Sequence, residues 1–275
     1  MKKTILTLIT IVSTIICNGQ SDTIFSNNEK ILCSVREITS EAVKYSLLEE
    51  ELTNSLYKNA VQKIVFKNGR TQIFSESSSF KKVLNVMDYE KVSISQLEGE
   101  VKGLYKLGEV SSKAEGGTSM SNQERVKERA YRKLKIQAAM QGANCIYLTH
   151  QRTQGNRSGG IFQSDMPSET NLSGIAYTTE LPSYADFEKL ISEEKEFNAV
   201  HEYILWSDMA NISQTKIQKK FSVTKVYNEN GQIILEGKLS CVRNYSRFRV
   251  VSFTKDHFTI FYKDKNSIHS IKIEL

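Results

Sequence analysis

The chain has 275 residues, of which 37 are Lys or Arg and 31 are Asp or Glu, for a net charge of +6. Its 39% hydrophobic and 25% charged residues are typical of a globular protein and exclude a disordered, collagenous or multi-span membrane chain. Four Cys and two Pro are too few for a disulfide-framed mini-protein or a Pro-rich stalk.

The first residues have the pattern of an export signal. Met1-Lys2-Lys3 forms a short positive segment, and residues 5–16 are apolar apart from Thr and Ser. This run is shorter than the roughly 20 residues that a membrane-spanning helix needs. The flanking residues predict cleavage between Gly19 and Gln20, and therefore a protein in the periplasm or outside the cell. Removal of residues 1–19 takes away two lysines and no acid, so the net charge falls from +6 to +4.

Cys17 raises the alternative of a lipid anchor. Lipoprotein signals place small residues directly before the modified Cys, whereas the bulky Ile16 precedes Cys17 here, so the sequence favours soluble export over lipidation. Cleavage leaves Cys33, Cys145 and Cys241 as candidate thiols or disulfide partners. Their odd number leaves at least one without an intrachain partner. Cys241 could pair with either of the others, and Cys33 and Cys145 lie in expected strands, where they would be small buried hydrophobic residues.

Residues 20–82 are expected to form a small SH3-like β-barrel. The segments 23–25, 30–38, 42–48, 61–66 and 71–74 are rich in β-branched and aromatic residues. Asn68-Gly69 predicts a type I′ hairpin turn, in which both residues have positive φ. The order of these segments resembles an N-terminal module of exported Bacteroidetes-type envelope proteins, which follows the signal peptide directly. That resemblance implies a location and a fold and carries no catalytic residues.

Residues 90–182 have the pattern of a βαββ domain. Residues 99–110 are expected to be one or two strands, and 111–121 a polar loop. Ser121 and Glu124 form a capping box at the start of a helix, and Gly142 is expected just beyond its end. A strand at 145–148, a Gly-rich excursion at 153–171 and a strand at 172–180 follow.

Part of this domain resembles a known family. Residues 130–148 end in Gly142-Ala143-Asn144, and Ser173-Gly174-Ile175-Ala176 opens the later strand. These features resemble the βαββ domain of the RcsF/YbjQ-like family of envelope proteins. The resemblance covers about 80 residues and implies a non-catalytic role in the envelope.

Residues 183–275 are expected to be a helix followed by an antiparallel β module. The helix is predicted over 184–197, where Phe187, Leu190 and Ile191 have helical spacing. Six strands are predicted at 203–206, 221–227, 232–239, 248–253, 258–262 and 267–273. Asn230-Gly231 predicts a second type I′ turn. The fold class is therefore α+β with several modules, and the last is expected to close into a sheet or small barrel.

Two basic regions are candidates for anion contact. The helix over 124–135 carries six Lys or Arg and two Glu, and its candidates are Arg125, Arg129, Arg132 and Lys133. Residues 216–275 carry twelve Lys or Arg and five Asp or Glu, with aromatic residues between them, a composition typical of oligonucleotide or polysaccharide binders. The alternatives are a solvated helix face and an ordinary aromatic strand core. Export removes nucleic acid as a partner.

Motifs for catalysis, metal or phosphate binding do not emerge from the sequence. Gly155, Gly159 and Gly160 lack the context of a phosphate loop, and the chain has no Gly-x-Ser-x-Gly elbow. The histidines lack metal-ligand spacing; they are His150, His201, His257 and His269. No catalytic residue, cofactor or metal ligand is therefore predicted.

These patterns predict a non-enzymatic exported envelope protein that binds or senses another envelope component, either a protein or the surface itself. No transmembrane span is expected, and peripheral membrane contact is one mode of binding. The alternative is a small-ligand or metal-binding module centred on the βαββ domain. An enzyme acting on glycan or peptide is a third hypothesis that rests on location alone.

Overall fold

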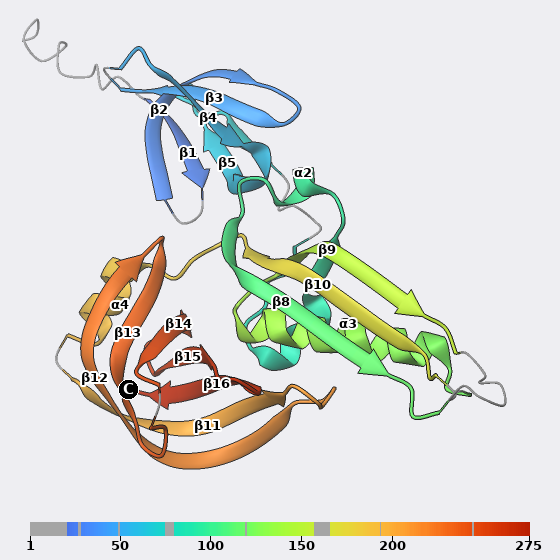
Figure 1. The fold of residues 1–275 in the computed structure, drawn as a ribbon. Coiled ribbons are helices and arrows are strands. Elements are labelled where there is room, and N and C mark those ends of the chain that lie inside the picture. Colours follow the sequence, from blue (N-terminus) through green and yellow to red (C-terminus); the bar gives the residue numbers. More distant parts are fainter. Residues whose placement is uncertain are drawn as a thin grey trace, which may run out of the picture. The chain divides into compact units, whose positions relative to one another are not determined.

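The computed structural model describes residues 21–26, 29–48, 50–74, 80–118, 120–156, 166–192, 194–243 and 245–275. Gly19, Gln20 and Cys17 lie outside them. The chain forms two compact units, Met1–Glu76 and Ser77–Leu275, so the expected middle and C-terminal domains belong to one unit. The fold is β-rich α+β with several sheets, as the sequence predicts (Figure 1). In the described residues, no helix has the length and apolar character needed to cross a membrane.

The first unit contains a six-stranded antiparallel sheet in the order β4-β3-β2-β1-β5-β6. One face of this sheet covers a small core formed by Ile24, Cys33, Val43, Ile64 and Phe74. A short 3-10 turn, η1 (Lys58–Ala60), precedes β5. The strands are β1 (Asp22–Ser26), β2 (Glu29–Ile38), β3 (Ala42–Leu47), β4 (Thr53–Tyr57), β5 (Val61–Val65) and β6 (Thr71–Ile73).

The turn between β5 and β6 is a hairpin, but the type I′ prediction for it is wrong. Only Gly69 has a positive φ, at 81°, and Asn68 is not among the residues with positive φ. The Gly69 amide donates to the Phe66 carbonyl, and the Phe66 amide donates to the Arg70 carbonyl. The connection is therefore a longer turn that closes on one left-handed glycine, the next most common solution for a hairpin.

The second unit begins with a four-stranded sheet in the order β7-β9-β10-β8, and α3 packs on it (Figure 1). The expected strand over 99–110 is in part wrong, because Glu98–Val101 forms the short helix α2. The expected loop over 111–121 is also too long, because β8 continues to Glu115 by pairing with Glu169 of β10. The elements are η2 (Val86–Lys91), β7 (Ser93–Ser95), α2 (Glu98–Val101), β8 (Tyr105–Glu115), α3 (Gln123–Met140), β9 (Cys145–Gln154) and β10 (Glu169–Thr178).

The ends of α3 depend on two local devices. The N-cap is Asn122, whose side chain accepts a hydrogen bond from the Arg125 amide, so the prediction of Ser121 was one residue early. At the other end Gly142 has φ of 79°, and its amide donates to the Ala139 carbonyl while the Ala143 amide donates to Ala138. This is the Schellman arrangement, and it confirms the predicted glycine.

Residues 183–275 form α4 and a closed barrel of six antiparallel strands. The predicted helix over 184–197 ends early, because the chain pairs with β12 from Glu196 and with β16 from Asn198. Asn230 and Gly231 have φ of 53° and 81°, which confirms the second type I′ turn. The elements are α4 (Tyr184–Leu190), β11 (Glu196–Trp206), β12 (Ser213–Glu229), β13 (Gln232–Leu239), β14 (Arg247–Phe253), β15 (His257–Lys263) and β16 (Ser267–Glu274).

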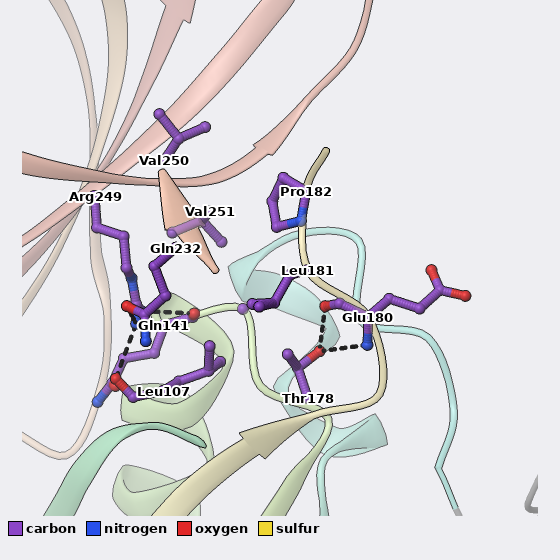
Figure 2. A pocket seen from close by; sticks show the side chains of 11 residues that line it. Leu107, Gln141, Thr178, Glu180, Leu181, Pro182, Gln232, Arg249, Val250 and Val251 are labelled. Atoms are coloured by element: carbon purple, nitrogen blue, oxygen red, sulfur yellow. Dashed lines mark hydrogen bonds between the residues drawn. The ribbon is translucent and has the colours of Figure 1, made fainter. Parts of the chain in front are cut away.

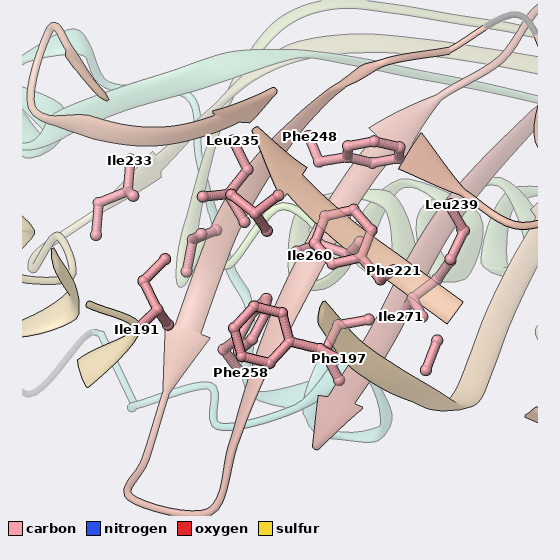
Figure 3. Close-up of a cluster of buried hydrophobic side chains, with 14 of the residues drawn as sticks. Ile191, Phe197, Phe221, Ile233, Leu235, Leu239, Phe248, Phe258, Ile260 and Ile271 are labelled. Atoms are coloured by element: carbon pink, nitrogen blue, oxygen red, sulfur yellow. The ribbon is translucent and has the colours of Figure 1, made fainter. Parts of the chain in front are cut away.

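The barrel interior is mostly aromatic and aliphatic. Figure 3 shows Phe197, Phe221, Phe248 and Phe258 in this interior, each fully or almost fully buried. Phe197 meets Phe258 edge to face with ring centroids 5.3 Å apart, and Phe221 meets Phe248 in the same way at 5.2 Å. Such pairs add about 0.5–1.5 kcal/mol each beyond the area that they bury.

Candidate functional site

The four basic residues singled out on α3 do not act together. Arg125 and Arg132 are exposed, and Arg129 donates to the Glu115 carbonyl at 2.7 Å. Lys133 is instead only 5% exposed and donates to the Ser207 carbonyl, so its assignment to an exposed basic face was wrong. The helix α3 has a second buried face, which packs against the barrel through Ile136 and Met140. The sequence pattern predicted only one buried face for this helix. Burial lowers the pKa of Lys133, with Asp208 acting in the opposite direction.

The three cysteines are free thiols in the structure. Cys33 and Cys145 are buried in strands, as expected, and burial raises the pKa of their thiols to about 11 and about 12. Both are therefore poor nucleophiles at neutral pH. Cys241 is exposed, in the turn after β13.

Side chains of α3 complete the edge of the four-stranded sheet. The outer strand β8 turns one row of backbone groups away from β10. The Gln137 amide donates to the Ser111 carbonyl at 2.6 Å, and its carbonyl oxygen accepts from the Ser111 amide. The side-chain amide of Gln141, the residue just after α3, donates to the backbone carbonyl of Glu109. Edge strands with free backbone groups invite pairing with another chain, and these contacts prevent it.

Arg249 of β14 joins the barrel to this sheet. Its Nη1 donates to the Leu107 carbonyl of β8 at 3.0 Å and to the Gln232 side chain at 3.1 Å. Its Nη2 donates at 2.7 Å to the carbonyl of Gln141, the residue that ends α3 (Figure 2). The guanidinium also lies 4.9 Å from the ring centre of Phe261. Burial lowers its pKa to about 10, so Arg249 is still charged at neutral pH.

The cavity beside Arg249 is too small for a substrate. It lies between Leu107, Gln141, Pro182 and Val251 (Figure 2) and holds about 10 Å³. That volume is at most enough for one water molecule. The geometry here is that of a structural junction, in which a cation neutralises the carbonyl end of a helix and satisfies a strand edge.

A second polar cluster, formed by Glu202, Ser267 and His269, lies inside the barrel. His269 Nδ1 is 2.9 Å from Glu202 Oε1, and its Nε2 is 2.8 Å from Ser267 Oγ. The three residues are 4%, 6% and 8% exposed. This continuous carboxylate–imidazole–hydroxyl chain has the connectivity that activates a serine in acyl-transfer enzymes. It is also a fully hydrogen-bonded way to bury three polar groups.

Two further residues hold this cluster in place. Lys219 Nζ is 2.8 Å from the other Glu202 oxygen, and the Tyr262 ring stacks on the His269 ring at 4.4 Å. Burial acts to raise the pKa of Glu202, but the hydrogen bonds from His269 and Lys219 outweigh it and leave the pKa below its usual value. Burial raises the pKa of Tyr262, and the nearby Glu202 charge adds to that effect.

The cluster was not predicted because its members come together only in the barrel. Ser267 and His269 are two apart on β16 and so share a face, which the sequence could have indicated. Glu202 is 67 residues from His269, and a register shift between Ala199 and His201 turns Glu202 inward. That irregularity has no signal in the residues around it. Elsewhere in the described segments, no three His, Cys, Asp or Glu side chains gather as a metal site requires.

The outer surface of β12 and β13 carries more lysines than acidic residues, with Glu236 opposite Lys225. We define the basic strand face as Lys216, Lys220, Lys225 and Lys238, all of them exposed. Ser222, in the same row as Lys220, pairs directly with Lys238, so these lysines point outward while Phe221 and Val223 point inward. Among the described residues none of the four forms an ion pair, and Lys225 lies over the Tyr227 ring at 5.0 Å. The basic composition of residues 216–275 is therefore concentrated in part on one surface.

Comparison with known proteins identifies no relative of this chain. No family model, no curated protein and no solved structure matches this chain.

Replacement of Arg249 with Met should destabilise the protein by about 2–3 kcal/mol. The change leaves the Leu107 and Gln141 carbonyls without their charged donor, and the loss of hydrogen bonds to a charged group in a partly buried site has this cost. Urea unfolding at pH 7 measures the effect. Arg247→Met is the matched control, because Arg247 forms an exposed ion pair with Glu229, and its loss should cost at most about 1 kcal/mol. Equal losses in the two variants would contradict the junction role.

Replacement of Glu202 with Gln should make the protein less stable at neutral pH and less sensitive to acid. The pKa of Glu202 is lower in the folded than in the unfolded state, so its contribution is present above about pH 4.5 and is lost as pH falls through the folded value. We expect a deficit of about 1–3 kcal/mol at pH 7 that shrinks below pH 4.5. Urea unfolding at several pH values measures it, with the exposed Glu274→Gln as control. Parallel pH curves for wild type and E202Q would contradict the inference.

Proposed function

We propose that the chain is a non-enzymatic exported protein of a bacterial envelope that binds an anionic envelope component through its basic strand face. The observation that carries this proposal is the set of four exposed lysines on the outer face of two paired strands. Residues four apart on a strand are about 13 Å apart, so Lys216 and Lys220 can contact successive charges of an extended polymer. An acidic polysaccharide has this form.

The rest of the second unit supports the proposal by holding this face rigid. The closed barrel leaves none of its six strands as a free edge, and the partly buried Arg249 and the buried Lys133 tie it to α3 and β8. Lysines on a rigid surface lose less conformational freedom on binding than lysines on a loop. The expected export signal, the SH3-like N-terminal module and the RcsF/YbjQ-like middle domain belong to the same proposal, because all three imply an envelope location.

Charge reversal at Lys220 and Lys238 should weaken binding to an acidic polysaccharide more than tenfold. Polygalacturonate is the probe, dextran the uncharged reference, and isothermal titration calorimetry the measurement. Binding by the wild type should weaken steeply with added salt, because exposed charges are screened within about 8 Å at 0.15 M. The control is Lys255→Glu, in the turn between β14 and β15. Equal affinity of the double variant and the control would contradict the proposal.

The buried cluster supports a second candidate function, acyl transfer. Ser267 would attack an ester or amide carbonyl, His269 would take the hydroxyl proton and return it to the leaving group, and Glu202 would orient the imidazole. The Ser267–His269 and His269–Glu202 distances of 2.8 and 2.9 Å meet the geometric requirement for such a chain. The hydroxyl is 6% exposed, so a substrate would have to enter the end of the barrel where β16 begins.

A fluorophosphonate probe separates the two functions. If Ser267 is activated, the intact folded protein should be labelled at Ser267, as located by peptide mass spectrometry, and Ser267→Ala should abolish the label. Ser270→Ala is the matched control, because Ser270 is buried on the same strand. An unlabelled wild-type protein would leave the cluster with a structural role only.

A further inference from the structure

The outer face of the N-terminal sheet combines exposed apolar side chains with lysines. We define the amphiphilic sheet face as Phe25, Lys30, Leu32, Lys63 and Ile73. The strand register places Ile73 opposite Lys63, Lys63 opposite Phe25, and Phe25 opposite Lys30, so four adjacent strands contribute to one row. Directly opposed residues in a sheet share a face.

A second row extends this face. Leu32 lies two residues from Lys30 on β2 and pairs with Thr23, which in turn pairs with Val65. The opposite face of the same strands carries Ile24 and Ile64, which belong to the core. Alternation along each strand therefore assigns the two sets of side chains to opposite sides of the sheet.

Two apolar members of this face, Leu32 and Ile73, are unusually exposed for their size, and Phe25 is half-buried. Ile73 is 71% exposed and Leu32 is 55% exposed. The two lysines flank the aromatic ring between them, with Lys63 Nζ 4.6 Å and Lys30 Nζ 5.7 Å from the centre of the Phe25 ring. The ammonium groups are thus held beside the apolar surface instead of extending freely into water.

The charge on this face has one sign. The two rows contain Lys30 and Lys63 and no acidic residue, because their other members are Thr23, Thr71 and Val65. Within the described part of the chain, neither lysine forms an ion pair. A partner must therefore offer negative charge and an apolar layer within a few ångströms of each other.

We propose that the amphiphilic sheet face docks on an anionic lipid surface. Leu32, Phe25 and Ile73 enter the boundary between head groups and acyl chains, while Lys30 and Lys63 contact phosphate oxygens. A lipid surface fits better than a folded acidic protein, because it presents negative charge and apolar surface as continuous layers at different depths, and long lysine side chains can bridge the two. This inference concerns the first unit and is independent of the basic strand face.

Vesicle co-sedimentation of the chain from Gln20 onward, the form expected after signal cleavage, tests the inference. The vesicles are phosphatidylcholine alone, or phosphatidylcholine with 30% phosphatidylglycerol. We expect binding to the mixed vesicles only, and binding that falls as salt is raised. Lys30→Ala with Lys63→Ala should weaken it about 25-fold, from about fivefold for each lysine near an anionic surface. Lys30→Arg with Lys63→Arg should retain it.

Further variants test the apolar part and the specificity. Leu32→Ser with Ile73→Ser should also reduce vesicle binding and leave the melting temperature unchanged, because both side chains are exposed. Lys220→Ala with Lys238→Ala should leave vesicle binding intact, so that failure here and failure on polygalacturonate are distinguishable. Equal binding to neutral vesicles, or no effect of the paired Lys30 and Lys63 change, would overturn the inference. A dimer of the wild type in analytical ultracentrifugation that becomes a monomer on Ile73→Ser would also overturn the inference. This face would then be an interface between two copies of the chain.

Discussion

The second unit depends on a partly buried guanidinium that has no carboxylate partner among its hydrogen bonds. Arg249 donates hydrogen bonds to the carbonyls of Leu107 and Gln141 and to the Gln232 side chain. One charged group therefore links a barrel strand, a sheet edge and a helix end. Those carbonyls are the groups that a strand edge and a helix terminus leave without partners. Desolvating the cation is costly, and the structure offsets that cost by satisfying several acceptors at once. Lys133 makes the reciprocal contact, from α3 to the Ser207 carbonyl.

This junction explains why residues 77–275 form one unit although they contain a sheet with its helix and a closed barrel. A second apolar contact accompanies the charged one, in which Ile136 and Met140 of α3 pack against Leu205 and Ile268 of the barrel. The helix thus has two buried faces, and the residue between them, Lys133, is buried as well. With the barrel anchored in this way, its free surface on β12 and β13 is available to a partner, while its interior holds the Glu202–His269–Ser267 cluster.

Local features of the fold were predictable where a few neighbouring residues determine the backbone conformation. Gly142 ends α3 and Asn230-Gly231 forms a type I′ turn as expected, because positive φ values there need residues without a large steric penalty. Asn68-Gly69 has the same pair of residues but forms a longer turn, so the dipeptide alone does not decide the loop length. Residues 184–197 have a helical pattern, yet the chain from Glu196 is a strand, because two neighbouring strands supply its hydrogen bonds.

By itself, the sequence determined the alternation of strands and the helix over most of its length, the burial of Cys33 and Cys145, and the concentration of positive charge near the C-terminus. These follow from composition and from periods of two or about four residues, which are local. The tertiary structure decided which lysines share the basic strand face, why Lys133 is buried, and that Glu202 meets a histidine 67 residues away. It also placed Phe25, Lys30, Lys63 and Ile73 in one row. Each depends on strand register and barrel closure, and those are set by contacts between segments far apart in the chain.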